Sequence, residues 1–195
     1  MIKAYGIYRK VRNASWQALI DNSIVSLPVD VVKITKQNGI TLLMDSDAKE
    51  LRDGEAGISI YDGSEWFVIY DDSLPIGRIV FTIAHELGHI FLGHPLIAGY
   101  HIRAKDGNTR PRTELEADSF ATRLLTPACV LWGLNIKTAA DILRVCDVPN
   151  DIAKTRAARM GELYKREKFL TSPLEAQVFE QFKAFIEQQK NMPPK

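Results

Sequence analysis

The residues best suited to chemistry lie in residues 77–93, which contain His85-Glu86-Leu87-Gly88-His89. On an α-helix, residues four apart lie about 40° apart around the axis and about 6 Å apart along it, so two such imidazoles can reach one ion. A glutamate between them completes the HExxH pattern of zinc hydrolases. We therefore expect His85 and His89 to be metal ligands. Glu86, which is rotated away from the histidine pair, is the candidate catalytic residue acting on water.

The residues around this motif are apolar on most of the helix circumference. A helix of this kind is typically buried, and buried histidine and glutamate side chains need partners because unpaired polar groups are costly to bury. The pattern therefore favours a metal site over a chance match on a surface helix.

A catalytic zinc site needs a third protein ligand and a water position. Residues 114–125 are predicted to form a helix that begins after Thr113. On its helical wheel, Glu114 and Asp118 lie one turn apart at the edge of the apolar face, and Glu116 falls on the opposite, solvated face. Glu114 is the candidate third ligand, and Asp118 could accept a hydrogen bond from a ligand histidine. Glu116 stays an alternative, and so does no ligand at all, because acidic residues are also favoured near helix N-termini.

Composition narrows the class of protein. The chain has 195 residues, 46% of them hydrophobic, which suits one domain or a domain with a helical appendix. Its net charge of +1 favours neither nucleic acid nor an anionic membrane. Cys129 and Cys146 are too few for a disulfide framework, which fits a reducing compartment. Without a signal peptide or a membrane-length apolar run, we expect a cytoplasmic protein.

Several short elements precede the HExxH helix. We expect helices over residues 5–20 and from Pro28 to residue 37, followed by strands at 40–44, 57–61 and 65–70. Asp62-Gly63 between the last two strands is a strong hairpin signal. The pattern predicts an α+β fold with a small antiparallel three-stranded sheet packed on the HExxH helix.

The chain after this helix divides into a loop and a helical region. Residues 96–112 have no clear periodicity, and His101 within them is better explained as a solvated loop residue than as part of a site. We place a metallopeptidase core at residues 1–127 and a helical C-terminal region at 128–195, ending in a helix over 174–189. Two short helices within residues 138–168 predict a helix-turn-helix-like segment. The small basic excess of residues 151–168 is better explained by a solvated face than by nucleic-acid binding.

Three stretches together resemble the ImmA/IrrE family of metallo-endopeptidases. They are RIVFTIAHELGHIFLGH at residues 78–94, ELEADSFATRLLTP at 114–127 and VPNDIAKTRAARM at 148–160. The resemblance implies a zincin-like fold and zinc-dependent hydrolysis of a peptide bond in the cytosol. Members of the family cleave or inactivate helix-turn-helix repressors of mobile elements or stress genes, so such a repressor is the implied partner.

The family pattern also implies roles for single residues. His85 and His89 match its ligand histidines, Glu86 matches its general base, and Glu114 matches the first glutamate of E-x-x-A-N/D-x-F-A. Asp118 occupies the N/D position of that pattern. By analogy with zincins, the strand at 65–70 could hold an extended substrate by edge pairing.

Two other functions are alternatives to proteolysis. A regulatory binding module would use residues 138–168 to sequester a repressor, with a structural or vestigial zinc. Direct DNA binding through the same segment is disfavoured by the balanced charge. We expect neither nucleic acid nor membrane as a partner.

Overall fold

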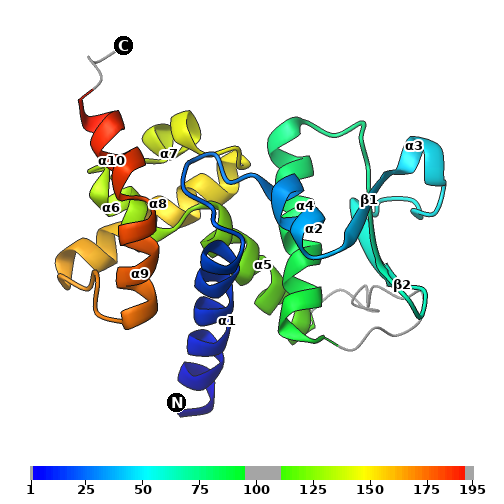
Figure 1. The fold of residues 1–195 in the computed structure, drawn as a ribbon, viewed down its shortest axis with the longest axis horizontal. Coiled ribbons are helices and arrows are strands. Elements are labelled where there is room, and N and C mark those ends of the chain that lie inside the picture. The colour runs from blue at the N-terminus through cyan, green and yellow to red at the C-terminus, as the bar shows by residue number, and fades with distance from the viewer. Residues whose placement is uncertain (1, 95–110, 192–195) are drawn as a thin grey trace.

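The computed structural model describes residues 2–94 and 111–191, and places α4 (Ile76–Leu92) between a small sheet and most of the other helices (Figure 1). The earlier prediction for residues 96–112, including His101, lies almost wholly outside the described residues. Within the described ranges, none of the helices combines the length and apolar character needed to span a membrane. The first half of the chain forms α1 (Ile2–Asp21), α2 (Val31–Gln37), β1 (Ile40–Met44), α3 (Asp45–Ala48), β2 (Gly57–Tyr61), β3 (Trp66–Tyr70) and α4 (Ile76–Leu92). The later helices are α5 (Arg112–Leu125), α6 (Ala128–Gly133), α7 (Ala139–Val145), α8 (Asn150–Lys165), α9 (Pro173–Gln181) and α10 (Lys183–Lys190).

The sheet is mixed, with strand order β1-β3-β2. The hairpin between β2 and β3 is confirmed, but β1 runs parallel to β3, so the prediction of three antiparallel strands is wrong. After the hairpin, β3 lies between β2 and β1, antiparallel to β2 and parallel to β1. Val68 and Ile69 of β3 point to opposite faces and are both buried, which shows that both faces of this central strand are covered. Because β3 has a partner on each side, it cannot pair with a substrate as an edge strand.

Three helix boundaries differ from those predicted. Pro28 follows a cis peptide bond and precedes α2, whose N-cap is Asp30 with its carboxylate accepting a hydrogen bond from Lys33 N at 2.8 Å. Helix α5 includes Thr113, because its N-cap is Pro111. The predicted final helix is interrupted at Phe182, a fully buried residue between α9 and α10.

The C-terminal helices share one hydrophobic core with the rest of the chain, which runs from Val11 to Ile186. Arg156 of α8 is buried and its Nε donates to the carbonyl of Thr126, just beyond α5, at 2.7 Å. Burial lowers the pKa of Arg156 to about 10. The two helices expected within residues 138–168 are present as α7 and α8. The division of the chain at residue 127 stays a prediction.

Helices α4 and α5 pack closely at Gly88, which lies between the two histidines of the motif. A Cβ atom placed on Gly88 would lie 3.1 Å from Ala117 Cα and 3.2 Å from Ala117 O. These distances leave no room for a side chain without a shift of α5. The glycine therefore sets the spacing that brings α5 against the histidine-bearing face of α4.

We expect Gly88→Val to destabilise the protein by at least about 1–3 kcal/mol, the usual cost of overpacking a well-packed core. Urea unfolding of the metal-free protein measures the change in the free energy of unfolding. Gly161→Val is the matched control, because Gly161 lies in α8 with no atom within 4 Å of its Cβ position. The control is expected to change stability by less than about 0.5 kcal/mol. Equal effects of the two substitutions would contradict the close approach at Gly88.

Candidate metal centre

The two histidines of the motif lie on the buried face of α4, and each is 8% exposed. One helical turn separates them, and the Nε2 atoms of His85 and His89 lie 3.0 Å apart. Both rings therefore present the same nitrogen to one point. This is the arrangement expected from the spacing of HExxH.

Glu114 of α5 completes the cluster. Its Oε2 lies 3.3 Å from His85 Nε2, and its Oε1 lies 3.3 Å from His89 Nε2. The three residues offer ligand atoms that all lie within 4.8 Å of one another. In a tetrahedral site with zinc–ligand distances of about 2.0–2.1 Å, neighbouring ligand atoms lie roughly 3.3 Å apart. The donor set and its spacing therefore fit a divalent metal ion such as zinc.

Asp118, one turn beyond Glu114 on α5, contacts the other nitrogen of His85. The distance from Asp118 Oδ1 to His85 Nδ1 is 2.9 Å, so an Nδ1–H donates to the carboxylate and leaves Nε2 free as a ligand. Burial by itself lowers the pKa of His85, but hydrogen bonds to Asp118 and Glu114 outweigh it and raise the pKa to about 9. The carboxylates around His85 thus favour its protonated form when no metal is bound.

Glu86 faces the sheet and is only 2% exposed. Its Oε2 accepts a hydrogen bond from Ser59 Oγ of β2 at 2.8 Å. Strand β2 comes close to α4 at Gly57, where an added Cβ would lie 2.4 Å from Thr82 Cγ2. The contact with Ser59 was not predicted, because the expected packing of the sheet on the HExxH helix does not say which strand residue meets Glu86.

Glu116 is not solvated, which corrects the prediction from the helical wheel. Its Oε2 lies 3.4 Å from His94 Nε2, and its Oε1 accepts a hydrogen bond from Arg112 Nε at 2.7 Å. Gly93, with a φ of +66°, ends α4 in the left-handed conformation and turns the chain so that His94 lies beside His89. Burial lowers the pKa of His94, although Glu116 opposes this effect. Glu116 is close to the centre but not among the three clustered ligand residues.

The fold is α+β, and its HExxH helix and α5 together bring His85, His89 and Glu114 into a cluster that could hold a metal ion. In comparisons with known families, residues 36–135 match the IrrE N-terminal-like domain, Peptidase_M78. The match covers just over half of the chain, which therefore belongs to this peptidase family, and the resemblance drawn from the sequence motifs is confirmed. Neither the search of curated proteins nor the search of solved structures returned a match.

Proposed function

We propose that the protein is a zinc-dependent endopeptidase that acts on a protein substrate in the cytoplasm. The observation that carries the proposal is the convergence of His85 Nε2, His89 Nε2 and a Glu114 carboxylate oxygen, with Glu86 on the same helix. Membership of a peptidase family supports the same chemistry. When bound, zinc would lower the pKa of a water molecule to about 7 and polarise the scissile carbonyl.

The remaining steps fall to side chains of the chain itself. His85, His89 and Glu114 hold the ion, and Asp118 orients His85 through its Nδ1–H. The Glu86 carboxylate takes a proton from the attacking water and delivers it to the leaving nitrogen of the peptide bond. Ser59 keeps that carboxylate in place by donating to Oε2.

The substrate is expected to bind along β2 rather than β3. Strand β2 is at an edge of the sheet, and through Ser59 it is the strand that contacts Glu86. An extended peptide paired with this edge would gain main-chain hydrogen bonds and pass close to the candidate catalytic residue. This assignment replaces the earlier expectation for residues 65–70.

We further propose a helix-turn-helix repressor as the substrate, on the strength of the resemblance to the ImmA/IrrE family. The test is to incubate the zinc-loaded protein with the repressor encoded nearest to its gene and to follow both by gel and mass spectrometry. The proposal expects new fragments that disappear after removal of zinc by a chelator and return on readdition. An intact repressor that co-elutes with the protein after long incubation would instead favour the regulatory binding module.

Ser59→Ala is expected to lower kcat about fivefold, because one hydrogen bond to Glu86, worth about 1 kcal/mol, is lost. Zinc affinity should stay unchanged, since the Ser59 hydroxyl donates to Glu86, which is not one of the three clustered ligand residues. Steady-state cleavage kinetics and zinc titration measure the two quantities. Ser59→Thr keeps the hydroxyl and should retain most of the activity. An alanine variant as active as the unchanged protein would remove Ser59 from the account.

A further inference from the structure

A chain of polar contacts extends from the metal centre on the side of His89. His89 Nδ1 lies 3.1 Å from His94 Nδ1, and His94 Nε2 lies 3.4 Å from Glu116 Oε2. Glu116 Oε1 in turn accepts a hydrogen bond from Arg112 Nε at 2.7 Å. These contacts therefore connect the candidate metal ligand His89 to the guanidinium of Arg112, at the start of α5.

Hydrogen positions along this chain follow from the role of His89. A ring nitrogen that binds a metal has no hydrogen, so the neutral imidazole of His89 has its hydrogen on Nδ1. His94 Nδ1 must then accept that hydrogen bond, which places the hydrogen of a neutral His94 on Nε2. This Nε2–H points to the Glu116 carboxylate. Each donor along the chain thus meets an acceptor when His89 Nε2 is a ligand.

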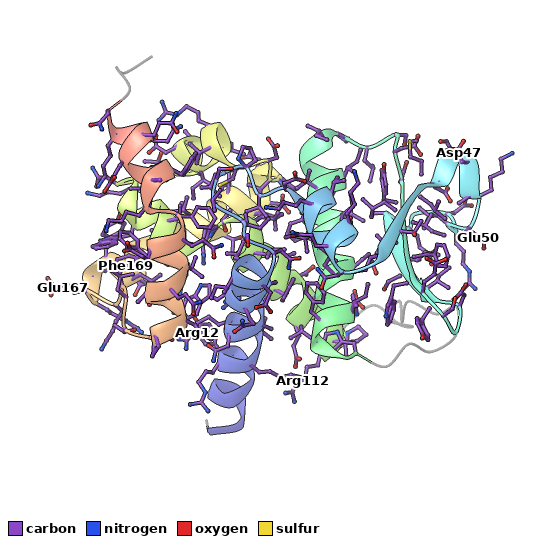
Figure 2. The ribbon with its side chains drawn as sticks, viewed as in Figure 1. Arg12, Asp47, Glu50, Arg112, Glu167 and Phe169 are labelled. Carbon is purple, nitrogen blue, oxygen red and sulfur yellow. The ribbon has the colours of Figure 1, made fainter. Side chains whose placement is uncertain are left out.

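The His94 side chain is held in position by burial, by a ring contact and by a backbone hydrogen bond. The His94 side chain is only 7% exposed, and its ring meets that of His89 edge-on with centroids 5.0 Å apart. The backbone N–H of His94 donates to His89 O at 3.0 Å. The turn at Gly93 therefore joins the two residues through the backbone as well as through their rings. Arg112 lies at the surface, where it is labelled in Figure 2, and the Glu116 side chain lies between it and His94.

We infer that His94 is a positioning residue for the metal centre: it holds His89 with Nε2 directed at the ion, as Asp118 does for His85. The inference rests on the proposed function, because it requires that His89 binds a metal. It goes beyond the three-ligand site by assigning an orienting partner to the second histidine. Glu116 supports this arrangement because its carboxylate accepts the hydrogen bond from His94 Nε2–H. Arg112 holds the Glu116 carboxylate by donating to its other oxygen.

Two substitutions at position 94 separate orientation from packing. His94→Phe keeps an aromatic ring and removes the acceptor for His89 Nδ1–H. His94→Asn keeps an acceptor close to the place of Nδ1 with a smaller side chain. The experiment titrates zinc into the unchanged protein and both variants in competition with a chromophoric chelator, and records thermal unfolding of each metal-free protein.

The inference predicts that His94→Phe weakens zinc binding about 10- to 100-fold, the usual effect of losing an outer-shell partner. The midpoint of thermal unfolding of the metal-free protein should stay close to that of the unchanged protein, and His94→Asn should recover most of the affinity. Zinc binding by His94→Phe as tight as in the unchanged protein would overturn the inference. So would a loss of affinity that accompanies lowered metal-free stability and is not recovered by His94→Asn. An unchanged protein that does not bind zinc would overturn the proposed function itself, and the inference with it.

Discussion

Glu86→Gln is expected to lower kcat for peptide-bond cleavage by about 10²- to 10⁴-fold, the range that general acid–base catalysis contributes. Glutamine has nearly the shape of glutamate and can still accept the hydrogen bond from Ser59 through its amide oxygen. It cannot take a proton from water at neutral pH. Because Glu86 is not among the clustered ligand residues, zinc affinity should change by no more than a few-fold. Cleavage kinetics and zinc titration on the same preparation measure both effects.

The matched control is Glu162→Gln. Glu162 lies on α8, and its Oε1 forms an exposed ion pair with Lys165 at 3.2 Å, an interaction of little energetic value. This variant should cleave at the rate of the unchanged protein. A Glu86→Gln protein that keeps full activity would remove Glu86 from the mechanism. Loss of zinc from that variant would show that Glu86 acts on the metal rather than on water.

Glu114→Ala is expected to weaken zinc binding by more than the roughly 100-fold that outer-shell changes cost, because it removes one of the three ligands. Cleavage activity should fall with it. The Glu114 carboxylate reaches both histidines at 3.3 Å, so no other described side chain occupies its place in the cluster. Zinc stoichiometry after dialysis and competition titration give the measurement.

Glu116→Ala provides the comparison, since the sequence left Glu116 open as the alternative ligand. Its carboxylate oxygens go to His94 and Arg112, so its removal should weaken zinc binding by about tenfold at most, through His94 alone. The reverse order, with Glu116→Ala losing zinc and Glu114→Ala keeping it, would contradict the ligand assignment. Equal losses would also contradict it.

Much of the site could be predicted because it depends on local periodicity. The positions of His85 and His89 follow from four-residue spacing on one helix, and the wheel separates Glu114 from Glu116 by the face each occupies. Contact between Asp118 and His85 follows from the same wheel once α5 lies on α4. These predictions needed only the geometry of single helices and the requirement for a third ligand.

The rest depended on how elements meet in space. A wheel treats α5 as an isolated helix, so it placed Glu116 in solvent and could not foresee that the turn at Gly93 brings His94 beside it. The parallel pairing of β1 was missed because strand order is set by tertiary packing and not by any residue of β1. The same limitation hid the contact of Ser59 with Glu86.

The proposed hydrolysis requires that two imidazoles and one carboxylate hold a single divalent ion. Crystals of the zinc-loaded protein, measured on both sides of the zinc absorption edge, test it most directly. We expect one anomalous peak, about 2.0–2.1 Å from the Nε2 atoms of His85 and His89 and at a similar distance from a Glu114 carboxylate oxygen. A zinc-loaded crystal with no peak there, or with its peak bound by other residues, would contradict it.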